Sequence, residues 1–295
     1  MNTEILQKLK ENISSVMIGN ETTIELVLTA LVAKGHILLE DVPGTGKTVM
    51  AKSLAKSVQA EFGRIQFTPD LLPSDVTGLN YFDVKRGEFV FSEGPAFCNI
   101  LLADEINRAT PKTQSSLLEC MAERQITVDG ETRALEEPFL VIATQNPLET
   151  LGTFPLPEAQ MDRFLMKLSM ETLSAKQEIS MIERFLTEEP LLELESVCKK
   201  EEICALQDAC KEVYLHPELI SYLVAVVQAT REAGKVASVK GREYVVPEDF
   251  KTVAVPVLAH RLTMQIGADD GKAGEAVIEE ILRSVPLPTE NWSGR

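Results

Sequence analysis

The chain has no long apolar segment, and its positively charged residues are too few to balance the acidic ones. No run approaches the 18 or more apolar residues that a membrane-spanning helix requires, which argues against insertion into a bilayer. The chain has 29 Lys and Arg against 45 Asp and Glu, so its formal charge is -16. Because so acidic a surface repels phosphate backbones, nucleic acid is not an expected partner.

Cysteine and histidine are scarce, and neither has the spacing of a metal site or a disulfide framework. The five cysteines are an odd number without a Cys-x-x-Cys pair, and the three histidines are isolated. The first residues, Met1 to Glu4, do not start a basic region followed by an apolar one, as a signal peptide would. We therefore expect neither zinc nor disulfides, and we expect the protein in the cytoplasm.

Short apolar runs alternate with helical stretches in the first half of the chain. We predict strands over these runs, at residues 36–40, 65–67, 100–103, 139–144 and 164–168. Strands that alternate with helices predict a parallel α/β sheet with helices on both faces. The third and fourth runs are almost entirely apolar, so we expect these two strands in the middle of the sheet.

The character of the sequence changes after the fifth predicted strand. Ser174 and Gln177 have the spacing of a capping box at the start of a helix, and apolar residues follow at helical intervals. A last helix is predicted over residues 275–285. At 295 residues the chain is long enough for two domains. We predict an α/β domain over 1–172 and an all-helical domain over 173–295.

A phosphate-binding pattern follows the first predicted strand. Residues 41–48 have the sequence Asp-Val-Pro-Gly-Thr-Gly-Lys-Thr, and a helical run begins at Val49. This is a P-loop in its required context of strand, loop and helix. The strict pattern has glycine where this chain has Asp41, so the match depends on residues 46–48 and on the context. The alternative is a glycine turn that caps a helix.

Each residue type in this loop has a role in phosphate binding. Gly44 and Gly46 permit backbone conformations that turn successive N–H groups inward, at the N-terminus of a helix. Lys47 is expected to reach the β- and γ-phosphates, and the Thr48 hydroxyl is expected to ligate Mg²⁺.

Two adjacent carboxylates, Asp104 and Glu105, follow the third predicted strand. Adjacent carboxylates repel each other, and at the end of a buried strand they are energetically costly unless a cation and a water engage them. In a P-loop enzyme the first acid holds Mg²⁺, usually through a water molecule, and the second can orient and deprotonate the attacking water. We assign these roles to Asp104 and Glu105; the alternative is a helix N-cap acid followed by an acid in the first turn.

Two further polar residues are candidates because of where they stand. Asn146 closely follows the fourth predicted strand, at the same sheet edge as Asp104, and could bind both the γ-phosphate and the water. Its alternative is a turn residue before Pro147. Arg163 ends a short helix before the last strand, at a rim from which it could reach a neighbouring subunit's nucleotide. Its alternative is a surface ion pair with Asp162.

Four segments together resemble the MoxR family of AAA+ ATPases. They are residues 38–48, 101–108, 114–130 and 143–164, and they cover nearly the whole predicted α/β domain. The resemblance implies a P-loop domain with a five-stranded parallel sheet of order 5-1-4-3-2, a C-terminal all-helical lid and ring assembly, usually as a hexamer. The family also accepts an acidic residue at Asp41.

The resemblance assigns further roles to individual residues. It implies Mg²⁺ binding by Thr48 and Asp104, Glu105 as the Walker B glutamate, Asn146 as sensor 1, and Arg163 as an arginine finger acting on the next subunit. The implied nucleotide contacts are Val42, Pro43, Gly44, Thr45, Gly46, Lys47, Thr48 and Val49, with Val16, Ile18 and Gly19 near the adenine.

Two segments resemble the hairpins that this family inserts into its α/β domain. Residues 67–95 resemble the insertion in the second helix, and residues 126–135 contain the turn signal Asp129-Gly130 and resemble the hairpin before sensor 1. Both are expected at one face or the pore of a ring. Their alternative is a pair of surface hairpins that shield the sheet edge.

The predicted lid departs from the family in one place. Members carry a Gly-x-Ser-Pro-Arg-Ala segment and a helix before a Gly-Arg-x-Tyr-Val stretch, whereas here Val239 and Lys240 lead directly into Gly241. The sensor 2 arginine has no counterpart, and we do not assign its role to Arg242. If this segment is truly deleted, closure of the lid on the γ-phosphate should be impaired.

The sequence therefore predicts an enzyme that hydrolyses ATP with Mg²⁺ and remodels protein clients. The family's usual clients contain von Willebrand factor A domains. One alternative is a binding module that switches conformation with ATP and scarcely hydrolyses it. Another is a DNA motor related to minichromosome helicases, which the acidic charge disfavours.

Overall fold

The computed structural model describes residues 3–40, 44–147, 152–185 and 189–213 as continuous segments. Beyond these it describes 217, 224, 254–259, 275–276, 278–279 and 281–283. The chain divides into two compact units, residues 2–207 and residues 208–295 with Met1. The first unit thus includes helices that the sequence analysis placed in the lid, and a lid boundary at residues 172 and 173 stays a prediction.

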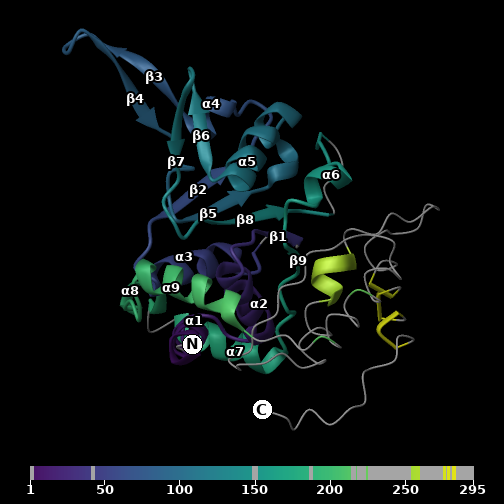
Figure 1. The fold of residues 1–295 in the computed structure, drawn as a ribbon. Helices are drawn as coiled ribbons and strands as arrows, with labels where there is room; N and C mark the ends of the chain where they lie inside the picture. Colours follow the sequence, from purple (N-terminus) through teal and green to yellow (C-terminus); the bar gives the residue numbers. More distant parts are fainter. Residues whose placement is uncertain are drawn as a thin grey trace. The chain divides into compact units, whose positions relative to one another are not determined.

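A five-stranded parallel sheet forms the centre of the first unit (Figure 1). Its strands are β1 (Ile37–Glu40), β2 (Phe62–Gln66), β5 (Ile100–Asp104), β8 (Leu140–Gln145) and β9 (Met166–Leu168). They lie in the order β2-β5-β8-β1-β9, and every neighbouring pair is parallel. Counted along the chain this order is 5-1-4-3-2, which confirms the predicted topology. β5 is buried along its whole length because helices cover both of its faces.

Helices pack on both faces of this sheet (Figure 1). One layer contains α1 (Thr3–Ser14), α2 (Glu21–Val32) and α3 (Lys47–Ser57), and the other contains α4 (Pro73–Thr77) and α5 (Pro111–Glu123). The buried positions of α5 recur at helical spacing, among them Leu117, Leu118 and Met121, and they join Val141 of β8 in one apolar cluster. The remaining short elements are η1 (Ile106–Arg108), α6 (Glu158–Met161), α8 (Pro190–Glu193), α9 (Lys200–Ala209) and η2 (Cys210–Glu212).

The helix predicted after the fifth strand is α7 (Ala175–Phe185). It begins with the expected capping box: the Ser174 amide donates to Gln177 Oε1 at 2.9 Å, and the Gln177 amide donates to Ser174 Oγ at 3.4 Å. The segment before this helix is also tied to the first unit, because the Glu171 amide donates to Asn20 Oδ1 at 2.9 Å.

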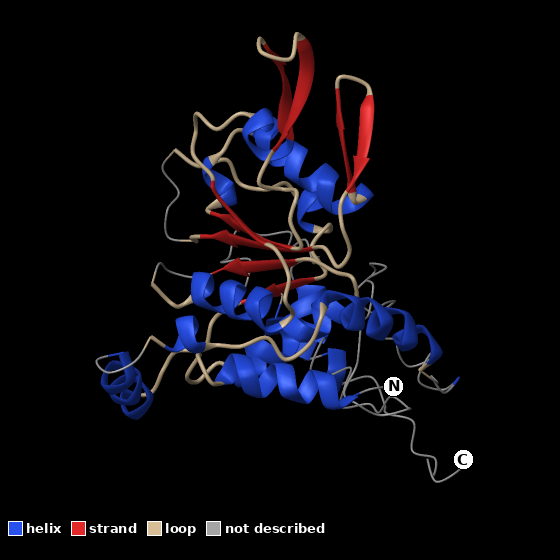
Figure 2. Cartoon of the chain, turned by 90° about the vertical axis from the view of Figure 1, so that its left-hand side faces the viewer, coloured by secondary structure: helices blue, strands red, loops and turns tan. Residues whose placement is uncertain are grey.

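Two antiparallel hairpins project from the α5 side of the first unit (Figures 1 and 2). One is β3 (Gly78–Asp83) with β4 (Glu88–Glu93), and the other is β6 (Gln125–Val128) with β7 (Glu131–Ala134). Asp129 and Gly130 have φ of 51° and 84°, as the predicted two-residue turn requires. The hairpins touch each other, because Asn80 Nδ2 donates to Asp129 Oδ2 at 2.8 Å.

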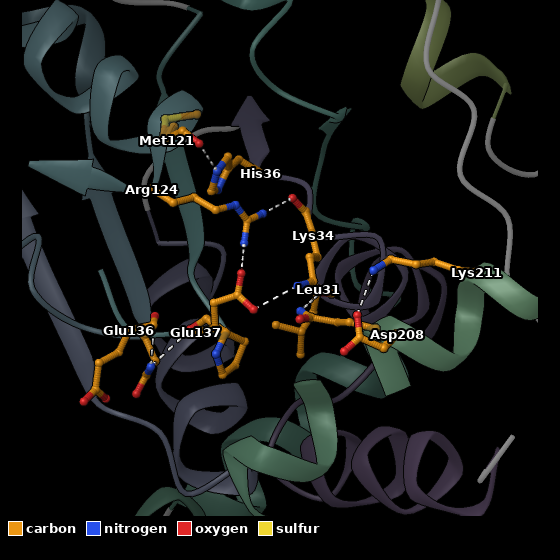
Figure 3. Close-up of polar contacts among 12 residues, drawn as sticks. Leu31, Lys34, His36, Met121, Arg124, Glu136, Glu137, Asp208 and Lys211 are labelled. Carbon is orange, nitrogen blue, oxygen red and sulfur yellow. Dashed lines mark hydrogen bonds and ion pairs between the residues drawn. The ribbon is translucent and has the colours of Figure 1, made fainter. Parts of the chain in front are cut away.

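A network of hydrogen bonds and ion pairs lies at the amino edge of the sheet, where β1 begins (Figure 3). The predicted P-loop follows the other end of β1. His36 precedes β1, and its Nε2 lies 3.0 Å from the Met121 carbonyl oxygen. Arg124 Nη2 donates to the Lys34 carbonyl oxygen at 2.6 Å, and Glu137 bridges the Lys34 ammonium at 2.8 Å and the Arg124 guanidinium at 3.4 Å. These contacts join the start of β1 to the end of α5 and to the segment before β8.

In the second unit the described residues 254–258, and those from 275 to 283, are helical. The predicted absence of a sensor 2 segment near Val239 and Gly241 falls on residues outside the described part of the chain. Among the described residues, no helix is both long and apolar enough to cross a membrane.

Candidate functional site

The carboxyl edge of the sheet borders a pocket of about 390 Å³. Eight residues that the sequence analysis singled out line this pocket: Gly44, Gly46, Lys47, Thr48, Val49, Asp104, Glu105 and Asn146. Four others that it did not single out also line it: Arg64, Gln66, Thr144 and Gln145. The pocket thus gathers polar groups from the ends of β2, β5 and β8 and from the N-terminus of α3.

The loop before α3 has the backbone of an anion-binding turn. Gly44 and Gly46 have φ of 88° and 92°, in the left-handed region that glycine enters without a steric penalty. α3 begins at Lys47, directly after Gly46. The first amides of a helix have no acceptor within the helix, so those at Lys47, Thr48 and Val49 are suited to bind phosphate oxygens.

Asp104 ends β5 and is engaged at both carboxylate oxygens. The Thr144 hydroxyl donates to Oδ1 at 2.8 Å, whereas Arg64 donates to Oδ2 from Nη2 at 2.7 Å and from Nε at 3.2 Å. Asp104 is only 9% exposed, so these contacts replace the water that its charge would otherwise need. A neutral donor therefore orients one oxygen, and a cation lies on the other.

Glu105 follows Asp104 in an unusual backbone conformation. Its φ of 56° lies in the left-handed region, which is uncommon for a residue other than glycine. Its amide donates to Thr144 Oγ1 at 2.9 Å, and its Oε2 lies 2.8 Å from Arg108 Nε. Thr144 thus holds the two acids together, because one hydroxyl bonds to the backbone of Glu105 and to the carboxylate of Asp104.

Asn146 follows the last residue of β8 and is 8% exposed. Its neighbour Gln145 pairs in register with Glu40 of β1, and Gln145 Nε2 donates to Glu40 Oε1 at 2.6 Å. Lys167 of β9 also contacts Glu40, at 2.6 Å. The end of β8 is therefore anchored across β1 to β9, which fixes the position from which Asn146 meets the pocket.

The segment expected near the adenine lies beside the P-loop. Val16 and Met17 are buried, and a Cβ built on Gly46 would lie 3.5 Å from Met17 Cε. Gly19 has φ of 68°, and a Cβ on it would lie 2.5 Å from Gln177 Nε2. Gln177 thus covers Gly19 closely. An adenine contact by Val16, Ile18 and Gly19 stays a prediction.

Two further predicted residues that the structure describes, Arg163 and Thr45, do not line this pocket. Arg163 is exposed, and its Nη1 donates to the Leu118 carbonyl oxygen at 3.5 Å. Thr45 is described and belongs to the same loop, but it is not part of the pocket wall. Val42 and Pro43 lie outside the described residues.

The residues of the pocket are suited to a magnesium ion. Asp104 and Thr48 offer the oxygen ligands that Mg²⁺ prefers, and the Arg64 guanidinium on Asp104 Oδ2 marks a position that attracts a cation. Within the described segments, no group of three or more His, Cys, Asp and Glu could hold a metal ion. Mg²⁺ typically uses one or two protein ligands together with substrate phosphates.

Sequence reasoning missed Arg64 and Thr144, although signals for both were present. The predicted sheet order puts the second strand beside the third, so polar residues at its carboxyl end share an edge with Asp104. Arg64 and Gln66 lie on one face of β2, because side chains alternate along a strand. Thr144 is the last residue of the fourth predicted strand, so its hydroxyl lies at the same sheet edge as Asp104.

Comparisons with known proteins agree with this geometry. Residues 36–166 match the ATPase family associated with various cellular activities (AAA), and residues 224–281 match the AAA lid domain. Chaperone MoxR1 of Mycobacterium tuberculosis is 38% identical over 97% of this chain and 83% of its own length. The chain belongs to the MoxR family of AAA+ ATPases.

Two further relatives of this MoxR-family chain match almost their whole length. The uncharacterized protein YeaC of Bacillus subtilis is 45% identical over 99% of this chain and 97% of its own. The crystal structure of a Cytophaga hutchinsonii protein proposed to be an ATPase has a TM-score of 0.85 and 34% identity, and covers 97% of this chain and 96% of its own. The AAA+ fold therefore applies to the chain as a whole.

Proposed function

We propose that this MoxR-family chain hydrolyses ATP with Mg²⁺ and uses the cycle to remodel protein clients. One observation carries the proposal. A single pocket contains the N-terminus of α3, the two acids after β5 and the amide after β8. These are the groups that bind phosphates, hold a metal ion and orient an attacking water in P-loop enzymes.

Phosphate binding falls to the loop and the first turn of α3. The amides at residues 46–48 would surround the β-phosphate, and the Lys47 ammonium would neutralise the β- and γ-phosphates. Thr48 and Asp104 would hold Mg²⁺, whose charge supports the negative charge that develops on the transferred phosphoryl group. Arg64 lies on the same carboxylate and would have to yield to the metal ion.

Glu105 would orient the attacking water and accept its proton. Its carboxylate is bonded to Arg108, and its backbone is fixed by Thr144, so the acid has a defined starting position. Asn146 would bind the same water and the γ-phosphate from the end of β8. Replacing Glu105 with Gln should therefore permit ATP binding and abolish turnover.

Assembly into a ring would complete each site. Arg163 is exposed and does not line the pocket of its own subunit, which supports a role at the site of a neighbouring copy. An arginine finger contributes on the order of 10³ to 10⁵ in rate. The specific ATPase rate should therefore rise steeply as the protein assembles, for which we propose a hexamer.

The two projecting hairpins are the surface that we propose for clients. Val84 and Phe89 at the end of the β3–β4 hairpin are 85% and 74% exposed, and the half-exposed Phe82 ring contacts Phe89, so apolar side chains gather at this end of the hairpin. Among clients, we propose proteins with a von Willebrand factor A domain. Capture on Glu105→Gln protein held in ATP, compared with Glu105→Gln protein whose hairpin carries Val84→Ser and Phe89→Ser, tests this role.

A second candidate is a switch that binds ATP and scarcely hydrolyses it. The alignment with YeaC spans 311 positions although this chain has 295 residues, so the relative contains residues without a counterpart here. If these residues belong to the sensor 2 segment, its lack would impair closure of the lid on the γ-phosphate. Equal turnover by wild type and Glu105→Gln would favour the switch, whereas a large difference would favour the hydrolase.

Calorimetry with ATP and Mg²⁺ tests the proposal at its base. Wild type should bind, and Lys47→Ala should bind far more weakly because the ammonium no longer neutralises the phosphates. Lys52→Ala, a lysine on the same helix that lies over the Phe62 ring, is a matched control and should bind as wild type does. Absence of binding by folded wild-type protein would overturn the proposal.

A further inference from the structure

Arg64 occupies one of the two carboxylate oxygens of Asp104, Oδ2. Its Nη2 and Nε both donate to Oδ2, at 2.7 and 3.2 Å, and its Nη2 also donates to Gln66 Oε1 at 3.3 Å. The other oxygen, Oδ1, is committed to the Thr144 hydroxyl, which is a neutral donor. A divalent ion that approaches Asp104 on the Oδ2 side meets the guanidinium, and a guanidinium and Mg²⁺ repel each other there.

We propose that Arg64 is an exchangeable counter-ion for Asp104, which sets how much Mg²⁺ the site needs. The inference rests on the proposed Mg-nucleotide site. Arg64 neutralises the Asp104 carboxylate and holds its rotamer until the metal ion displaces it. Arg64 lines the pocket wall beside Gln66.

The exposures of the two partners make this exchange feasible. The side chain of Asp104 is 12% exposed and would be costly to leave unpaired, whereas that of Arg64 is 47% exposed and can turn into water. The pair is therefore stable enough to protect the carboxylate and weak enough to be displaced. A charge-assisted hydrogen bond that is weakened by this exposure should raise the Mg²⁺ concentration needed for half-maximal binding about five- to tenfold.

The test is the Mg²⁺ dependence of nucleotide binding. Binding of a fluorescent ADP analogue is measured across free Mg²⁺ concentrations for wild type, Arg64→Met and Arg64→Lys. Arg64→Met removes the charge and should lower the Mg²⁺ midpoint about five- to tenfold, whereas Arg64→Lys should stay closer to wild type. Arg86→Met, which disrupts the exposed Arg86–Asp83 pair in the β3–β4 hairpin, is the control and should leave the midpoint unchanged.

The outcomes separate this inference from the proposed function. If wild type binds no nucleotide at any Mg²⁺ concentration, the proposed function fails. If wild type binds and Arg64→Met has the same or a higher midpoint, or if binding is independent of Mg²⁺, the exchange at Asp104 is wrong and the nucleotide site stands.

A second measurement uses only the wild-type protein, in case the Arg64 variants do not fold. The Nε–H of Arg64 donates to Asp104, so its NMR signal should shift when Mg²⁺ is added to protein saturated with the ADP analogue. The signal should not shift when EDTA is present. A signal that is the same with and without Mg²⁺ would overturn the exchange.

Discussion

Protonation of His36 should destabilise the fold, because both ring nitrogens are already committed. The Val141 amide donates to Nδ1 at 3.0 Å, so Nδ1 carries no proton, and Nε2–H donates to the Met121 carbonyl oxygen at 3.0 Å. The imidazole is 4% exposed and lies edge to face with Phe139, 5.6 Å between ring centroids. A proton on Nδ1 would face the Val141 N–H, a donor opposite a donor.

The pKa of His36 gives the size of the effect. Burial lowers this pKa from 6.5 to about 4, the Met121 carbonyl partly opposes the shift, and the nearby Arg124 charge adds to it. Above pH 6.5 both the folded and the unfolded chain carry a neutral imidazole, so the full stability is present. Between pH 6.5 and 4 only the unfolded chain takes up the proton, and stability falls by about 2 kcal/mol at pH 5 and about 3 kcal/mol at pH 4.

Urea unfolding of wild type and His36→Gln at pH 7 and pH 5 measures this contribution. Glutamine can accept from one amide and donate to one carbonyl but cannot be protonated, so the variant should lose about 2 kcal/mol less than wild type over this range. The other titrating groups are common to both proteins and cancel in the difference. Equal losses, or an NMR titration that puts the folded His36 pKa near 6.5, would refute the reasoning.

Three further predictions concern the pocket. Thr144→Val should lower the free energy of unfolding by about 2 kcal/mol and weaken Mg-nucleotide binding, because the Glu105 amide loses its acceptor and Asp104 loses a donor. Thr144→Ser keeps the hydroxyl, so its stability and nucleotide binding should stay close to those of wild type. Equal defects in the two variants would contradict this role of Thr144. Gly44→Ala and Gly130→Ala should each introduce about 1–2 kcal/mol of strain, because both residues have a left-handed backbone, and neither added Cβ meets another atom within 4 Å. Calorimetry should nevertheless find weaker nucleotide binding only for Gly44→Ala, because only Gly44 lines the pocket. Arg163→Ala and Glu105→Gln proteins should each be inactive alone and recover ATPase activity when mixed, whereas an arginine that acts within its own subunit predicts no recovery.

The sheet and most of the pocket could be predicted because local sequence determines them. The buried runs of β5 and β8 allow few alternatives to central parallel strands, and the glycines before Lys47 require positive φ. Once the strand order is known, the residues after each strand must share one edge. Asp104 and Asn146 could therefore be predicted to lie together, and both line the pocket.

Contacts between strands were harder to predict, because they depend on side-chain reach and not on local pattern. Gln66 is the residue of β2 that pairs in register with Asp104, but the residue that bonds to the Asp104 carboxylate is Arg64, two positions earlier. A flexible side chain of that length has many possible partners, so its partner follows only from the packed structure. His36 was isolated in the sequence, and the hydrogen-bond partners of its two ring nitrogens come from residues 121 and 141.

The contacts around Thr144 connect binding of the metal ion to positioning of the water. One hydroxyl donates to Asp104 and accepts from the Glu105 amide, so a shift of the Asp104 carboxylate toward a metal ion also moves the acceptor of that amide. Arg64 and Arg108 each neutralise one of the two acids from outside. Exchange of Arg64 for Mg²⁺ would therefore alter the backbone support of Glu105, and turnover should depend on Mg²⁺ more steeply than nucleotide binding does.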